Sequence, residues 1–159
     1  MTVHKRLLDE GIRHKLVIVG EGYDRENIEK EIHNTHTEDS VILPGYCSNP
    51  YPYIAGSRVF VCSSFTEGLP VVCMEALCLG VPIVSSYPSV EELFGEEKCG
   101  IVTDNSEDGL FDGCRRLLSD ENEYRLVKEA AKRRAVDFSG KKMVADVEKM
   151  FVSLSEEKK

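Results

Sequence analysis

Two glutamates, Glu67 and Glu75, frame the apolar segment "EGLPVVCME". Pro70 can begin a helix and Gly80 can end it. The first turn of such a helix presents unpaired amides and the positive end of the helix dipole, which together suit a phosphate group. Glu75 would lie about 7–8 Å further along the axis. Carboxylates on both sides of a phosphate site suit a nucleotide sugar, which carries ribose hydroxyls at one end and hexose hydroxyls at the other.

A second interpretation of the same motif needs no ligand. Glu75 would meet a lysine or solvent, and Glu67 would only precede a helix in a favourable place. On the motif alone the two interpretations are equally good. The remaining side chains from Pro70 to Gly80 are apolar or small, which predicts a helix that is buried all round.

Two further loops could approach a ligand. Gly20, Glu21 and Gly22 directly follow the apolar run "KLVIV", and glycines there allow close approach of a backbone. A dinucleotide fingerprint would need a third glycine at position 25, which is Arg25, and a plain tight turn explains the pattern equally well. The segment "PGYCSNPYPY", with Gly45 and Tyr46, could present an aromatic ring to a base or could be a loop stiffened by prolines.

Short β-branched runs alternate with helical patterns along most of the chain. The predicted strands cover residues 15–20, 40–45, 58–64, 81–86 and 99–104, and each is followed by a helical pattern. Apolar strands that alternate with helices predict a parallel sheet covered on both faces. The sequence therefore predicts a doubly wound, Rossmann-like α/β domain, and ligands of such domains bind beyond the carboxyl ends of the strands.

The two ends of the chain differ from this alternation. The segment "VHKRLLDEGIRHK" predicts a helix that runs into the first strand, so a strand before it is expected to be missing. The last third predicts a helical tail of three helices, and the third of these would align Met143, Val147, Met150, Phe151 and Leu154.

The composition limits the classes of partner. The 159 residues fit one domain, and the net charge of −8 argues against a nucleic-acid partner. The segment 128–142 holds six basic and two acidic side chains, which suit a solvated helix face better than an anionic membrane.

No apolar run nears the roughly 20 residues of a membrane span, and no signal peptide is visible. The six cysteines form no CxxC pair, so we expect reduced thiols, a cytoplasmic protein and no metal site.

The segment "EGLPVVCME" resembles the Glu-x7-Glu signature of the retaining group-1 glycosyltransferases, which have the two-domain GT-B fold. The resemblance extends to "KLVIVGEG", to residues 41–86 and to "DFSGKKMVADVEKMF", in the same order as in the C-terminal, donor-binding domain of that family. It implies one nucleotide-sugar-binding domain over residues 1–159. That domain would be the C-terminal half of a hexosyltransferase of polysaccharide biosynthesis that uses a UDP- or GDP-sugar and needs no cofactor.

The resemblance also implies a role for each candidate residue. Glu67 would be the catalytic residue, beside the reacting carbon of the donor sugar, and Glu75 would bind the ribose hydroxyls. Backbone contacts to the sugar, the diphosphate and the nucleobase would come from two short segments and from the first glycine loop: Gly68, Leu69 and Pro70; Gly45 and Tyr46; Gly20, Glu21 and Gly22.

Two departures from the family pattern are visible. The N-terminal acceptor-binding domain is absent, and so is the loop whose Arg and Lys neutralise the diphosphate, which would precede Thr2. The chain is therefore expected to be an inactive fragment of an enzyme whose acceptor is a glycan or a lipid-linked sugar. Peripheral contact with the inner face of the membrane is expected for the full-length protein. Three alternatives remain: a nucleotide-sugar epimerase-like domain, a dinucleotide-dependent dehydrogenase and a non-catalytic nucleotide-binding module.

Overall fold

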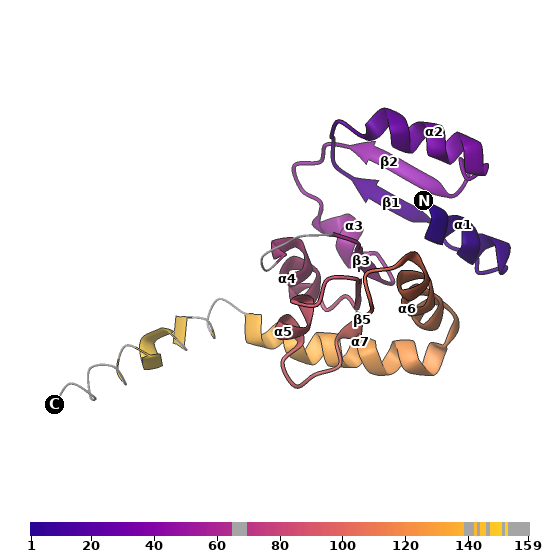
Figure 1. The fold of residues 1–159 in the computed structure, drawn as a ribbon. Coiled ribbons are helices and arrows are strands. Elements are labelled where there is room, and N and C mark those ends of the chain that lie inside the picture. Colours follow the sequence, from indigo (N-terminus) through magenta and orange to yellow (C-terminus); the bar gives the residue numbers. More distant parts are fainter. Residues whose placement is uncertain (65–69, 139–141, 143, 146, 151, 153–159) are drawn as a thin grey trace.

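The computed structural model describes residues 1–64, 70–138, 142, 144, 145, 147–150 and 152. Helices and strands alternate from the first residues to the end of the fifth strand, and helices follow (Figure 1). The elements are α1 (Thr2–Asp9), β1 (Leu16–Val19), α2 (Arg25–Thr35), β2 (Val41–Gly45), α3 (Tyr51–Ala55), β3 (Phe60–Cys62), α4 (Val71–Cys78), β4 (Ile83–Ser85), α5 (Val90–Phe94), β5 (Gly100–Val102), α6 (Glu107–Ser119), α7 (Glu121–Ala135) and a 3-10 turn (Val136–Phe138).

The five predicted strands are all present, and every strand pair is parallel. Helices cover both faces of the sheet that β3, β4 and β5 form. Ile83 and Val84 are neighbours on β4, so their side chains point to opposite faces, and both are fully buried. Ile83 belongs to a cluster with residues of α4 and α5, whereas Val84 belongs to a cluster with residues of α1 and α6. This confirms the doubly wound α/β class.

The strands divide into two sheets, β1–β2 and β3–β4–β5. The N–H of Leu16 donates to Ser40 O, and the N–H of Gly20 donates to Gly45 O, both at 2.9 Å. The backbone hydrogen-bonding groups of alternate residues of β1 therefore point toward β2. The backbone groups of Val17 and Val19 therefore point away from β2. On β3, the Phe60 N–H donates to Pro82 O at 2.8 Å, so Val61 points away from β4.

No backbone hydrogen bond among the described residues joins β1 to β3. The usual strand order of a doubly wound sheet is 3-2-1-4-5-6. The order β2–β1 followed by β3–β4–β5 matches it with the central strand left out. The two sheets thus flank a place for one more parallel strand.

Helix α1 links the two sheets on one face. Leu7 is buried in the same cluster as Phe111 and Leu117 of α6 and α7's Val127. The Arg6 Nη1 atom lies 2.7 Å from Asp108 Oδ1, and its guanidinium lies over the Phe111 ring. The predicted helix does not run into β1: it ends at Asp9, because Gly11, at φ +80°, lets its N–H donate to Leu8 O and closes the last turn.

The tail is helical, as predicted, but only its first two helices pack on the domain. The described residues of 142–152 extend away from the domain (Figure 1). Val147 and Met150 are each about half exposed there, whereas Met143, Phe151 and Leu154 lie outside the described residues. No helix in the described part of the chain is long and apolar enough to cross a membrane.

All six cysteines lie in the described ranges, and none of them forms a disulfide. Four of them are buried, Cys47 is partly buried and Cys78 is exposed. Burial raises the pKa of both Cys99 and Cys114 to about 11. In the described ranges no three His, Cys, Asp or Glu side chains gather as metal ligands would.

Candidate functional site

The first two predicted loops meet at the carboxyl ends of β1 and β2. The Gly20 N–H donates to Gly45 O at 2.9 Å, and Val19 pairs with Gly45 in the strand register. Gly20 has φ +132° and Gly45 has φ +78°, conformations that favour glycine. A Cβ atom added at Gly20 or Gly22 would meet no atom of the described residues within 4 Å. Both backbones therefore border open space, as close approach of a ligand requires.

Glu21 does not present a free carboxylate to this space. Its Oε1 atom accepts a hydrogen bond from Arg25 Nη1 at 2.8 Å, and Arg25 Nε donates to Glu29 Oε1 at 2.9 Å. The same Oε1 atom would lie 2.5 Å from a Cβ placed on Gly45. The carboxylate thus packs over Gly45 and ties the first loop to α2. Arg25, which occupies the position of the third glycine in a dinucleotide fingerprint, supports this arrangement.

Tyr46 follows Gly45 and is 79% exposed, so its ring is available to a ligand. The short helix α3 begins five residues later, at Tyr51. Its start is held by Asn49, whose Oδ1 accepts the N–H of Tyr51 at 3.3 Å. Asn49 therefore contributes to the start of this helix, and Pro50 directly precedes α3.

The third loop lies only partly within the described residues. Glu67, Gly68 and Leu69 lie outside them, so the first half of the Glu-x7-Glu frame has no structural account here. Pro70 is buried and directly precedes α4, and the carbonyl of Pro70 accepts the N–H of Cys73 at 3.0 Å. The helix ends before Gly80, whose φ is +65°.

Helix α4 is not buried all round, contrary to the sequence-based expectation. Cys73, Ala76 and Leu77 are fully buried, whereas Val71 and Val72 are 60% and 48% exposed. The helix covers the sheet with one side only, so its other side faces solvent. The amides of the first turn lie on this partly exposed segment.

Glu75 is partly buried and meets a partner that the sequence did not predict. The Tyr51 hydroxyl donates to Glu75 Oε1 at 3.1 Å. Neither a lysine nor an arginine pairs with Glu75 within the described ranges. The hydrogen bond to Glu75 and its negative charge raise the pKa of Tyr51. The Glu75 carboxylate accepts this one hydrogen bond and has lone pairs left for other donors.

Ser86 is a second residue that sequence reasoning missed. It follows β4 at the same edge of the sheet and is 1% exposed. Its hydroxyl has no hydrogen-bond partner among the described residues, although buried hydroxyls usually have one. The pair of serines that ends "VPIVSS" was the only signal in the sequence.

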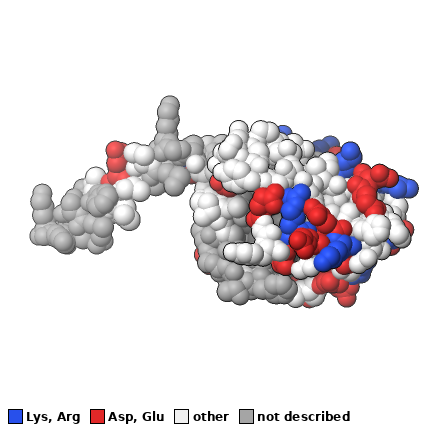
Figure 2. Space-filling model, turned by 90° about the horizontal axis from the view of Figure 1, so that it is seen from above, with Lys and Arg blue, Asp and Glu red and all other residues white. Residues whose placement is uncertain are grey.

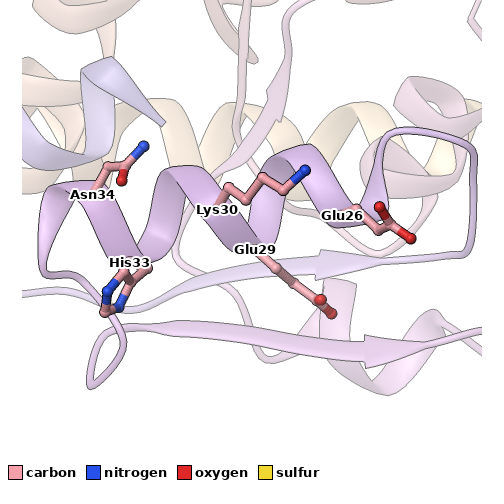
Figure 3. A pocket seen from close by; sticks show the side chains of 5 residues that line it. All are labelled: Glu26, Glu29, Lys30, His33 and Asn34. Atoms are coloured by element: carbon pink, nitrogen blue, oxygen red, sulfur yellow. The ribbon is translucent and has the colours of Figure 1, made fainter.

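The structure also has a hollow on the outer side of α2, away from the three loops described above. Figure 3 shows its five lining side chains, all from that helix: Glu26, Glu29, Lys30, His33 and Asn34. It brings together none of the predicted site residues. Figure 2 shows acidic and basic side chains interspersed on the face seen from above, with no patch of one sign.

Comparison with known proteins identifies the family. Residues 2–134 match the family described as "Glycosyl transferases group 1". This chain belongs to the group-1 glycosyltransferases. A relative from Campylobacter jejuni, N-acetylgalactosamine-N,N'-diacetylbacillosaminyl-diphospho-undecaprenol 4-alpha-N-acetylgalactosaminyltransferase, is 32% identical over 135 residues, which is 83% of this chain and 37% of that protein.

Solved structures of glycosyltransferases share the fold. One is a mutant of TarM from S. aureus in complex with fondaparinux, alpha-GlcNAc-glycerol and UDP. Its TM-score is 0.78 at 20% sequence identity, and the match covers 91% of this chain and 30% of the TarM chain. Another is the pneumococcal O-GlcNAc transferase GtfA in complex with UDP and GlcNAc. Its TM-score is 0.76 at 21% sequence identity, and the match covers 94% of this chain and 30% of the GtfA chain. This group-1 chain thus spans about a third of the length of the proteins it matches.

Proposed function

We propose that this chain is the donor-binding domain of a retaining glycosyltransferase. The enzyme would transfer a hexose from a UDP- or GDP-sugar to a glycan or lipid-linked acceptor. The observation that carries the proposal is the geometry of the carboxyl edge. The two glycine loops are joined there, their backbones border open space, and Glu75 carries an unneutralised carboxylate.

The chemistry follows from the leaving group. A nucleoside diphosphate departs with developing negative charge, which fixed dipoles can stabilise without reorganisation. The first turn of α4 offers such dipoles at Val71 and Val72. We propose that Glu67 positions the donor sugar and stabilises the charge on it, with no covalent intermediate and no divalent metal.

The acceptor is proposed to bind to a separate, N-terminal domain. One observation supports this: the chain spans 37% of its Campylobacter relative. The name of that relative contains a diphospho-undecaprenol group, which supports a lipid-linked acceptor. We therefore also propose a cytoplasmic enzyme at the inner face of the membrane.

Titration of the chain with UDP, GDP and NAD tests the proposal. We expect weak binding of UDP or GDP, unchanged by EDTA, with NMR shifts at the amides of Gly20, Gly22 and Gly45. We expect weak binding because the titrated chain spans only part of its relatives' length, and a second domain that closes over the site would exclude water and strengthen electrostatic contacts. Binding of NAD alone, or a strict Mg²⁺ requirement, would contradict the proposal.

A further inference from the structure

The hydrogen bond from Tyr51 to Glu75 joins two of the ligand loops. Tyr51 is the first residue of α3, which follows the Gly45–Tyr46 loop, and Glu75 lies in α4, which follows the third loop. The two residues are 24 positions apart, and the bond is 3.1 Å long. It therefore connects the part of the edge proposed to meet the nucleobase with the part proposed to meet the ribose.

The tyrosine is held at a stiff point of the chain. Pro50 and Pro52 flank it, so the backbone on either side has restricted dihedral angles. Its N–H donates to Asn49 Oδ1 at 3.3 Å, and the Asn49 carbonyl accepts from Cys47 Sγ at 3.2 Å. The hydroxyl thus reaches Glu75 from a preorganised position.

A phenol holds a carboxylate differently from a lysine or an arginine. It donates one hydrogen bond and adds no charge, so Glu75 keeps its full negative charge. A carboxylate has roughly four lone-pair sites, and Tyr51 occupies one of them. Glu75 can therefore be oriented by Tyr51 and still accept hydrogen bonds from the hydroxyls of a ligand.

We propose that Tyr51 is a positioning residue that makes nucleotide binding depend on the ribose hydroxyls, because it fixes the Glu75 carboxylate that accepts from them. This inference rests on the proposed function, in which Glu75 binds the ribose. Tyr51 itself need not touch the nucleotide. Its effect is on the discrimination between a ribonucleotide and its deoxy analogue.

The test compares five forms of the chain: wild type, Tyr51→Phe, Glu75→Gln, the double variant of these two substitutions, and Tyr53→Phe. Tyr53 is a matched control, since it lies on the same helix, is 42% exposed and makes no hydrogen bond to Glu75. The ligands are whichever of UDP and GDP binds more tightly and the 2′-deoxy form of that nucleotide. Dissociation constants come from NMR titration, and thermal unfolding checks that each variant is folded.

We expect Tyr51→Phe to weaken binding of the ribonucleotide by about three- to tenfold, the range for loss of one hydrogen bond to a charged group in a partly exposed site. Binding of the deoxynucleotide should change little, so the preference for ribose should shrink. Tyr53→Phe should match the wild type. In the double variant with Glu75→Gln, the Tyr51→Phe substitution should have no further effect.

The outcomes separate the inference from the proposed function. If Glu75→Gln changes neither affinity nor the preference for ribose, the proposed role of Glu75 is wrong, and the inference fails with it. If Glu75→Gln reduces the preference and Tyr51→Phe does not, the inference alone is wrong. Equal weakening of both nucleotides by Tyr51→Phe would also overturn it, because that result indicates a merely structural role.

Discussion

Glu67 and Glu75 are proposed to act at different stages of the reaction, and substitutions should separate them in the full-length enzyme. Glu75 would hold the ribose, which does not change during transfer, so Glu75→Gln should raise KM and leave kcat nearly intact. Glu67 would lie beside the sugar, where charge develops, so Glu67→Gln should lower kcat by about tenfold per 1.4 kcal/mol lost.

Steady-state kinetics and titration with bare nucleotide check this prediction together. Glu67→Gln should leave nucleotide binding intact, whereas Glu75→Gln should weaken it. The reverse pattern would show that the two ends of the donor are assigned the wrong way round. If neither substitution has an effect, the Glu-x7-Glu spacing is a coincidence.

Ser86 gives a second prediction at the scale of a residue. Its buried hydroxyl has no partner among the described residues, and an unsatisfied buried polar group costs about 1–3 kcal/mol. Ser86→Ala should therefore stabilise the chain by about 1 kcal/mol in urea unfolding.

Ser85 is the matched control for this experiment. Its hydroxyl accepts from the Tyr87 N–H at 2.9 Å and donates to Tyr87 O at 3.2 Å. Ser85→Ala should destabilise the chain by about 1 kcal/mol. Equal destabilisation by both substitutions would show that the Ser86 hydroxyl is satisfied in solution.

At the scale of elements, the junction of the first two loops depends on Gly45. A side chain at φ +78° costs about 1–2 kcal/mol, and the added Cβ would also displace the Glu21 carboxylate. Gly45→Ala should lower the free energy of unfolding by about that amount. Gly22→Ala is the control, because a Cβ there meets no described atom and Gly22 is not among the glycines with positive φ, so it should leave the free energy of unfolding unchanged or raise it by about 0.4–1 kcal/mol.

The packing of α1 against the start of β2 should make stability depend on pH. His4 is 4% exposed; its Nδ1 lies 2.8 Å from His14 Nε2, and its Nε2 lies 2.9 Å from Ser40 Oγ. Burial, followed by the charges of His14 and the N-terminus, lowers the pKa of His4 to about 4. Between pH 4 and about 6.5 the unfolded chain therefore binds more protons than the folded chain.

Stability from His4 should accordingly be complete above pH 6.5 and fall as the pH drops toward 4, by at most about 3 kcal/mol. Thermal unfolding between pH 7.5 and 4.5 measures this loss of stability. The His4→Gln substitution should flatten the dependence of stability on pH in this window. The control is His36→Asn, at an exposed position with φ 53° that asparagine tolerates. Identical profiles for the wild type and His4→Gln would contradict the assignment.

Local patterns were sufficient to predict the elements but not the contacts between them. Each strand is an apolar run, and Pro70 and Gly80 bound α4 within one or two residues. The bond from Tyr51 to Glu75 and the packing of Glu21 over Gly45 each join segments 24 residues apart. No local preference encodes these contacts, and the division into two sheets likewise depends on pairing between distant strands. The geometry of Glu67 lies outside the described residues and stays a prediction.

At the scale of the whole molecule, the edge of β1 that faces away from β2 and the edge of β3 that faces away from β4 should make the chain self-associate. Strand edges with unpaired backbone groups pair readily with other chains, and Val17 and Val61 are 39% and 43% exposed there. Sedimentation of the chain should show a molar mass that rises with concentration. Val61→Lys should reduce the association, whereas Leu126→Lys, at a 71% exposed position on α7, should not. A monomer at every concentration would show that these edges are protected.

The link that α1 makes with α6 also determines how the molecule opens. No strand pairing crosses between the sheets in the described residues. Residues 1–45 contact the remainder through Leu7, Val3 and Ile12 in the apolar cluster and through Arg6. Local unfolding follows cooperative units of this kind. The amide hydrogens of β1 and β2 should exchange with solvent in one sub-global unfolding event. Strand β4 is buried on both faces, so its amide hydrogens should exchange only through complete unfolding.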